Sequence, residues 1–337
     1  MKLFPSLALL LVLGAASLQS CKENSKKTES TDGGSATQEV LVNAPVFNAD
    51  SAYAFIQKQV DFGPRIPNSK AHQACGDWLV AKLKGYGFTV TEQKFTETAY
   101  DGTKLNARNI IGSFNPDAAK RILLTAHWDT RPFADKDTDP KYKDKPFDGA
   151  NDGGSGVGVL LEIARNLHAK PLGNVGIDII FFDIEDWGEK EGVERSGNRE
   201  NWALGSQYWA KNLHKPGYSA YYGILLDLVG AKGAQFPQEA NSLQYAQSIV
   251  QNIWNTASKL GYDPYFLPVP GGGLTDDHVA VNEVAKIPMV DIVEMKVNSP
   301  KTFGEYHHTH ADNMEVIDRN VLKAVGQTVT QVLYQEQ

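Results

Sequence analysis

The sequence predicts a three-layer α/β/α sandwich around a mostly parallel, mixed central sheet. Short apolar segments at 121–126, 177–183 and 221–226 are rich in Ile, Leu and Phe, as expected of strands that are buried on both faces. They alternate with longer segments of helical periodicity, an order that is typical of a parallel sheet covered by helices. The chain has 337 residues, 42% of them hydrophobic and 22% charged, which is an ordinary soluble composition.

The predicted elements follow one another from residue 49 to the C-terminus. Apolar residues three and four positions apart predict helices at 49–61, 69–86, 155–168, 203–213, 242–260 and 316–334. Alternating or continuous apolar runs predict strands at 88–95, 106–114, 121–126, 177–183, 221–226 and 287–293. Glycine-rich segments at 149–154 and 271–273 indicate loops.

The N-terminus is predicted to be an export signal that does not belong to the fold. Lys2, the apolar run at 7–13 and the segment Leu18-Gln19-Ser20-Cys21 resemble a bacterial lipoprotein signal at 1–20, with Cys21 lipidated. Gln19 is not the usual small residue, which leaves ordinary signal-peptidase cleavage open. Residues 21–45 are polar and are expected to form a flexible tether. We therefore expect an exported protein, lipid-anchored to a bacterial envelope membrane and facing the periplasm or the cell surface.

Charge and cysteine content narrow the possibilities for residues 46–337, which are predicted to be a single catalytic domain. The formal net charge of −7 gives nucleic-acid binding no electrostatic support. The sequence has two cysteines, and lipidation of Cys21 leaves Cys75 alone, so the mature fold cannot contain an internal disulfide. We expect core packing to stabilise this domain.

Acidic and histidine side chains stand where the predicted strands end. Glu185 and Asp186 follow the strand at 177–183, and His127, Asp227 and Asp291 lie at or near the ends of three others. Ligands bind outside the carboxyl ends of the strands in such sheets, so we expect one site there. Adjacent carboxylates repel one another unless a cation or a shared proton offsets the charge. Adjacent residues in an extended chain also point in different directions, so one can bind a metal while the other faces a substrate.

This donor set is typical of zinc, whose catalytic sites keep one position open. Three separate segments would supply the ligands: Asp152, Asp186 and His308. His127 and Asp227 are candidates for a second metal, and Glu185 is the natural general acid/base. Taken alone, the Asp-rich loop is equally typical of a turn or a calcium site. A serine hydrolase is not favoured, because no Gly-Xaa-Ser-Xaa-Gly segment follows a strand.

Six motifs occur in the order of the zinc-dependent aminopeptidase-like superfamily. They are His127-Trp128-Asp129, GAND at 149–152, FFDIED at 181–186, LLDLVG at 225–230, Asp276-Asp277-His278 and His308-Thr309. Within this superfamily the chain is most similar to the glutaminyl cyclases (glutaminyl-peptide cyclotransferases), from about residue 62 to the C-terminus. The resemblance implies the aminopeptidase-like (phosphorylase/hydrolase-like) fold. It also implies conversion of N-terminal glutamine of peptides and proteins to pyroglutamate, with release of ammonia.

The resemblance also implies roles for individual residues. A single zinc ion would be held by Asp152, Asp186 and His308, with Asp186 standing where many relatives have Glu. Glu185 matches the proton-shuttling Glu of the family. The two carboxylates that form a hydrogen-bonded network with it correspond to Asp227 and Asp276.

The chain departs from the family pattern at two positions. Asp291 stands where the family has an additional His, so a catalytic role for Asp291 is the least defined of these assignments. His307 replaces the Trp that commonly precedes the His ligand in the wall of the substrate pocket. Trp187 or Trp202 would provide the aromatic wall instead, and simple packing explains either of them equally well.

Two other functions stay open. A two-zinc aminopeptidase would use Asp152 as the bridging ligand, His127 and Asp227 at the second metal, and Glu185 to activate water for hydrolysis of N-terminal residues. The Asp276-Asp277-His278 motif favours the cyclase. A non-catalytic surface-binding lipoprotein would use the fold as a scaffold, but none of the expected ligands is missing. The expected partners are peptides with N-terminal Gln, and the membrane only through Cys21.

Overall fold

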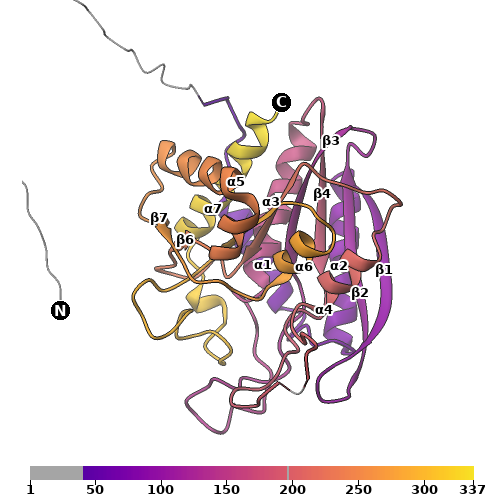
Figure 1. The fold of residues 1–337 in the computed structure, drawn as a ribbon, viewed down its shortest axis with the longest axis vertical. Coiled ribbons are helices and arrows are strands. Elements are labelled where there is room, and N and C mark those ends of the chain that lie inside the picture. Colours follow the sequence, from indigo (N-terminus) through magenta and orange to yellow (C-terminus); the bar gives the residue numbers. More distant parts are fainter. Residues whose placement is uncertain (1–40, 196) are drawn as a thin grey trace, which may run out of the picture. The chain divides into compact units, whose positions relative to one another are not determined.

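A six-stranded mixed sheet forms the centre of the computed structural model, which describes residues 41–195 and 197–337 (Figure 1). Across the sheet the order is β1 (Thr89–Thr98), β2 (Lys104–Phe114), β4 (Val175–Phe182), β3 (Lys120–His127), β5 (Tyr222–Asp227) and β8 (Met289–Val293). The last four strands are parallel, whereas β1 and β2 pair antiparallel with each other and β2 pairs antiparallel with β4. The predicted mostly parallel, mixed sheet is therefore confirmed.

Helices cover both faces of this sheet (Figure 1). One face carries α1 (Ala49–Val60), α2 (Lys70–Gly85), α3 (Gly154–Ala169), α5 (Ala240–Lys259) and α7 (Arg319–Gln335). The other carries the shorter α4 (Leu204–Lys211) and α6 (Asp277–Glu283). Alternate residues of β3 divide between two cores, with Ile122 and Leu124 in the first and Leu123 in the second. Because strand side chains alternate in direction, this division confirms the three-layer sandwich.

Side-chain caps define where several of the helices begin. Asn48, Ser69 and Asp318 accept hydrogen bonds from backbone N–H groups in the first turns of α1, α2 and α7, and Glu239 does so for α5. The first turn of α3 differs, because Gly153 has a positive φ of 76° and offers no side-chain cap. This helix begins directly after the Asp-rich loop, at the carboxyl ends of the strands.

The structure adds elements that the sequence pattern did not predict. A small parallel sheet pairs β6 (Phe236–Gln238) with β7 (Phe266–Pro270), and α6 and a short 3₁₀ helix, η1 (Met314–Val316), are also new. β8 starts at Met289, two residues later than expected, and ends at Val293 as predicted, so Asp291 lies two residues before its end. The predicted signal, Cys21 and most of the tether lie outside the described residues. Among the described residues, no helix is long and apolar enough to cross a membrane.

Candidate active site

Three parallel strands bring their acidic and histidine residues to one edge of the sheet. His127 ends β3, Asp227 ends β5, and Glu185 and Asp186 follow β4. The loop between β3 and α3 adds Asp152 to this edge. His127 Nε2 lies 3.1 Å from Asp152 Oδ1 and 3.2 Å from Asp227 Oδ1. The expected convergence of these side chains is present in the structure.

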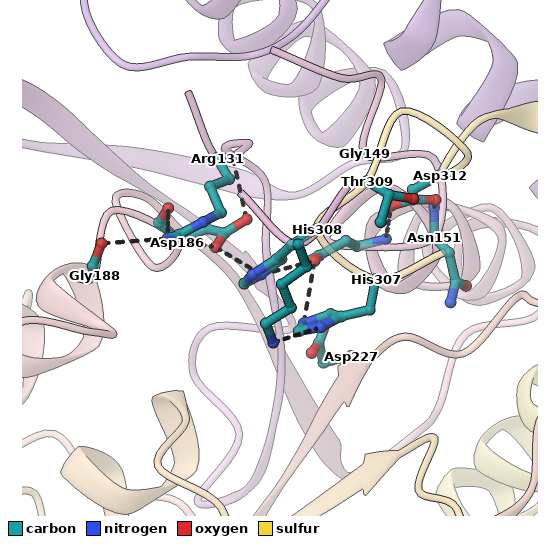
Figure 2. Close-up of polar contacts among 12 residues, drawn as sticks. Arg131, Gly149, Asn151, Asp186, Gly188, Asp227, His307, His308, Thr309 and Asp312 are labelled. Carbon is teal, nitrogen blue, oxygen red and sulfur yellow. Dashed lines mark hydrogen bonds and ion pairs between the residues drawn. The ribbon is translucent and has the colours of Figure 1, made fainter. Parts of the chain in front are cut away.

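A second set of contacts surrounds His308, which comes from the loop before α7. His308 Nε2 lies 3.2 Å from Asp186 Oδ1 and 3.5 Å from Asp152 Oδ2. In Figure 2, His308 lies between Asp186 on one side and Asn151 and Asp312 on the other. Asp152 thus contacts His127 through one carboxylate oxygen and His308 through the other.

The chemistry of these donors fits zinc. Asp152 Oδ2 and Asp186 Oδ1 are buried without a hydrogen-bond partner, and both face His308 Nε2. Buried carboxylate oxygens that accept no hydrogen bond are costly unless a cation or a proton balances them. Arg131 Nη1, 3.7 Å from Asp186 Oδ1, provides part of this balance at Asp186. Two carboxylates and one imidazole are a zinc donor set that leaves a coordination position open.

Asp129 anchors the backbone that carries the adjacent carboxylates. Its two oxygens accept hydrogen bonds from the N–H groups of Glu185 (3.1 Å) and Asp186 (3.2 Å). Asp129 Oδ1 also lies 3.5 Å from His127 Nδ1, as the His-Xaa-Asp spacing predicts for an orienting carboxylate. Ile184 adopts a left-handed conformation (φ 49°) in the turn after β4. The turn and these two hydrogen bonds fix where Glu185 and Asp186 point.

Asp312 anchors the backbone of the Asp152 loop, as Asp129 anchors that of Glu185 and Asp186. The sequence analysis did not identify Asp312. Its carboxylate accepts hydrogen bonds from the N–H groups of Asn151 (2.8 Å) and Asp152 (3.0 Å). Burial and the nearby Asp152 raise the pKa of Asp312 to about 8. Asn151 in turn accepts from the N–H of Gly230 (2.7 Å), so the loop is tied to the chain after β5.

Arg131 is a further residue that the sequence analysis missed. Its backbone N–H donates to Asp186 Oδ2 (3.1 Å), and its guanidinium donates to the carbonyls of Asp186 and Gly188 (3.3 Å each; Figure 2). A bidentate pair with Asp135, at 2.9 and 2.7 Å, holds the guanidinium in place. This buried cation fixes the far side of Asp186.

The predicted catalytic carboxylates meet at a cavity of ≈ 260 Å³ beside these donors. Glu185, Asp227 and Asp276 line it together with Asp152 and His308. Burial, with added repulsion from Asp276 and Asp186, raises the pKa of Glu185 well above its usual range. Burial and Asp227 raise the pKa of Asp276 to about 6. The cavity therefore favours protons shared among carboxylates, as expected of a proton-transfer site.

Two of the three proposed pocket-wall residues line this cavity. Trp202 stacks on His308 with ring centroids 5.9 Å apart and an interplanar angle of 7°. His307 also lines the cavity, and its Nδ1 lies 3.1 Å from Lys136 Nζ. Trp187 does not contribute to the wall. It packs with Ile184 and other apolar side chains in a separate cluster, which explains its burial.

Known proteins resemble this chain in both sequence and structure. The sequence model of "Peptidase family M28" matches residues 109–333. The glutaminyl-peptide cyclotransferase of Gloydius blomhoffii is 26% identical over 286 residues, covering 76% of this chain and 73% of the relative.

Two solved structures cover nearly the whole described region. The glutaminyl cyclase of Porphyromonas gingivalis is 52% identical with a TM-score of 0.83, covering 87% of this chain and 100% of that one. A Zn-dependent exopeptidase from Parabacteroides distasonis is 55% identical with a TM-score of 0.84, covering 87% and 99%. These similarities agree with the fold and with the zinc-type donor set. The chain belongs to peptidase family M28.

Proposed function

We propose that the protein is a zinc-dependent glutaminyl-peptide cyclotransferase that converts N-terminal glutamine of peptides to pyroglutamate. The observation that carries this proposal is the position of Glu185, which faces the cavity directly beside the zinc-type donors and next to Asp276 and Asp227. The high identity to the glutaminyl cyclase of Porphyromonas gingivalis supports it.

Asp152, Asp186 and His308 would hold the zinc ion. When bound, zinc supplies Lewis-acid polarisation of the substrate's γ-carboxamide oxygen. Arg131 and Asp312 position this ligand set, because they bind Asp186 and the backbone of the Asp152 loop respectively. The chain thus provides both the ligands and the groups that orient them.

The reaction joins two parts of the same substrate molecule. The α-amine of the N-terminal glutamine attacks its own γ-carbonyl carbon, a C–N bond forms, and the bond to the amide nitrogen breaks. Glu185 takes a proton from the attacking amine and delivers one to the departing nitrogen, which leaves as ammonia. Because nucleophile and electrophile are already tethered, effective molarity contributes a large part of the rate. Asp276 and Asp227 line the same cavity as Glu185, and their charges influence whether Glu185 carries a proton.

Matched peptides test this reaction. The purified tether-free protein, loaded with zinc, is expected to release ammonia from a peptide that begins with glutamine. It should release none from the same peptide with an acetylated N-terminus, because acetylation removes the nucleophile. Ammonia release from both peptides would indicate simple amide hydrolysis and contradict cyclisation.

The two-zinc aminopeptidase is a second candidate, and one observation favours it. His127, Asp152 and Asp227 place donor atoms within 4.8 Å of one another, and Asp152 also faces His308. This arrangement suits a bridging carboxylate between two metals. Metal analysis separates the candidates, since the cyclase is expected to hold one zinc per chain and the aminopeptidase two.

We further propose that the protein is exported and lipid-anchored through Cys21 to a bacterial envelope membrane, facing the periplasm or the cell surface. Lys2, the apolar run at 7–13 and the segment ending at Cys21 support this proposal. The full-length protein is expected to partition into the detergent phase of Triton X-114, and a Cys21→Ser variant into the aqueous phase. Detergent partition of both proteins would contradict lipidation at Cys21.

A further inference from the structure

A group of buried polar side chains lies behind Asp276 and has no place in the mechanism above. Glu239 caps the N-terminus of α5, His278 is in the first turn of α6, and Asp291 is in the middle of β8. All three are completely buried. Asp276, His278 and Asp291 place polar atoms within 4.8 Å of one another. The group therefore connects three elements to one cavity-lining carboxylate.

Glu239 is the most heavily hydrogen-bonded member of this group. Its Oε1 accepts from the N–H groups of Asn241 (2.9 Å) and Leu274 (3.0 Å), and its Oε2 from the N–H (2.6 Å) and Oγ (2.8 Å) of Ser242. His278 Nε2 lies 3.2 Å from the same Oε2. Burial acts to raise the pKa of Glu239, but hydrogen bonds from His278 and the α5 backbone outweigh it and set the pKa at about 2.

An ionised carboxylate can only accept, so the contact with Glu239 requires a hydrogen on His278 Nε2. The other ring nitrogen, Nδ1, then faces Asp291 Oδ2 at 3.7 Å. Neither oxygen of Asp291 has a hydrogen-bond partner, and Asp276 lies close by. If Asp291 were ionised like Glu239, its buried negative charge would have no hydrogen-bond donor to stabilise it. Asp291 therefore fits as a neutral carboxylic acid between His278 and Asp276.

Glu239 also holds the chain on both sides of Asp276. Leu274, whose N–H it binds, lies two residues before Asp276, and His278 lies two residues after it. Ser242 Oγ, which donates to Glu239, accepts from the N–H of Asp291 and so fixes β8 against the same centre. The position of Asp276 is thus determined from α5, α6 and β8 together.

We propose that Glu239 and His278 are positioning residues that fix Asp276, with Asp291 as the link, in the orientation that proton transfer at Glu185 requires. The proposal rests on the proposed function, because Asp276 acts there. Neither residue reaches the cavity, so a change at either would act on turnover and leave substrate binding and metal loading intact.

The test uses Glu239→Gln, which keeps the side-chain volume but replaces one acceptor oxygen by an NH₂ donor. We expect kcat for a glutamine-initiated peptide to fall at least tenfold, with KM and zinc content unchanged. Glu162→Gln is the matched control, because Glu162 is an equally buried glutamate whose partners are Arg165 and the N–H of Asn48. The control should keep wild-type kcat. Unchanged kcat in Glu239→Gln, or loss of zinc from it, would overturn the proposal.

A second measurement is made on the wild-type protein and does not depend on the reaction catalysed or on the folding of Glu239→Gln. In ¹⁵N-histidine-labelled wild-type protein, the His278 ring, assigned through its absence in His278→Gln, should show a protonated Nε2. A proton confined to Nδ1 would contradict the assigned network. If the wild-type protein hydrolyses N-terminal residues instead of cyclising glutamine, the proposed function fails. The kcat of that hydrolysis then reports on the same positioning effect.

Discussion

Glu185 and Asp186 are neighbours in sequence, yet they meet different surroundings. Glu185 lines the cavity, whereas Asp186 points to His308 and is held by the N–H of Arg131. Asp129 binds both backbone N–H groups and so fixes this division. One residue is thereby free for proton transfer while the next is available to a metal.

Replacing Glu185 by glutamine tests the proton shuttle. The change keeps the shape of the side chain and removes its basicity, so we expect kcat to fall by about 100-fold to 10,000-fold. Zinc content should stay at the wild-type level, because Glu185 is not among the expected ligands. The exposed Glu315 provides a control variant, Glu315→Gln, with unchanged kcat. Near-normal turnover in Glu185→Gln would remove this residue from the mechanism.

Replacing Asp186 by alanine tests the metal site. The change removes the oxygen that faces His308 Nε2 at 3.2 Å, so the zinc content after dialysis should fall well below that of the wild type. Metal analysis by mass spectrometry measures this directly. Asp144→Ala is a suitable control, because Asp144 is exposed and pairs only with Lys190 among the described residues. Full zinc loading in Asp186→Ala would reassign the ligand.

Much of this site could be predicted from the sequence because its residues stand at fixed places in the fold. His127, Glu185, Asp186 and Asp227 follow buried strands, and the carboxyl ends of parallel strands share one edge. Arg131 and Asp312 escaped prediction because they act through backbone groups of distant segments, which no local pattern encodes.

At the scale of elements, α3 is the helix that places the Asp152 loop. A Cβ on Gly156, in the first turn, would lie 2.1 Å from the carbonyl oxygen of Leu226 in β5 and 2.9 Å from the Cβ of Ala126 in β3. Only glycine allows the helix to approach the strands this closely. The loop before α3 therefore reaches the strand ends where its aspartate is needed.

Gly156→Ala should destabilise the fold, because the added methyl group meets backbone atoms that cannot move away. The expected loss in the free energy of unfolding is about 1–3 kcal/mol, measured by urea denaturation. Gly85→Ala serves as the control, since no atom lies within 4 Å of its added Cβ at the end of α2. Equal stability of the two variants would show that α3 can shift without cost.

The N-terminus of α5 carries a pH-dependent contribution through Glu239. The folded pKa of about 2 lies below the ordinary value of 4.5, so the stabilisation is present above pH 4.5 and is lost as the pH falls toward 2. The groups that face Glu239 are His278 on α6 and Asp291 on β8. We expect the stability difference between wild type and Glu239→Gln to be constant above pH 4.5 and to shrink below it. A difference independent of pH would contradict an ionised Glu239.

Strand and helix order could be read from the sequence because the buried strands are continuous apolar runs. The elements that were missed are short or atypical. β6 has three residues, β7 contains two prolines, and α6 has seven residues. Such segments gain their structure from tertiary contacts, as when Asp276 caps α6 at the edge of the cavity. The later start of β8 has the same origin, because its pairing with β5 begins at Met289.

At the scale of the whole molecule, one sheet edge organises fold and function together. Residues from the ends of β3 and β5 and from four loops meet there, among them the loop that follows β4. Some of them form the zinc-type donor set, and others line the cavity whose carboxyl groups share protons. Membership of peptidase family M28 accounts for this arrangement. The solved structures that resemble the chain, however, include both a glutaminyl cyclase and an exopeptidase. The central claim is the choice between these two reactions.

Mass spectrometry of a glutamine-initiated peptide incubated with the zinc-loaded, tether-free protein tests that claim most directly. The cyclase predicts a product that has lost ammonia and keeps every residue, formed in the wild type and strongly reduced in Glu185→Gln. Release of free glutamine, leaving a peptide one residue shorter, would contradict the claim and assign His127 and Asp227 to a second metal.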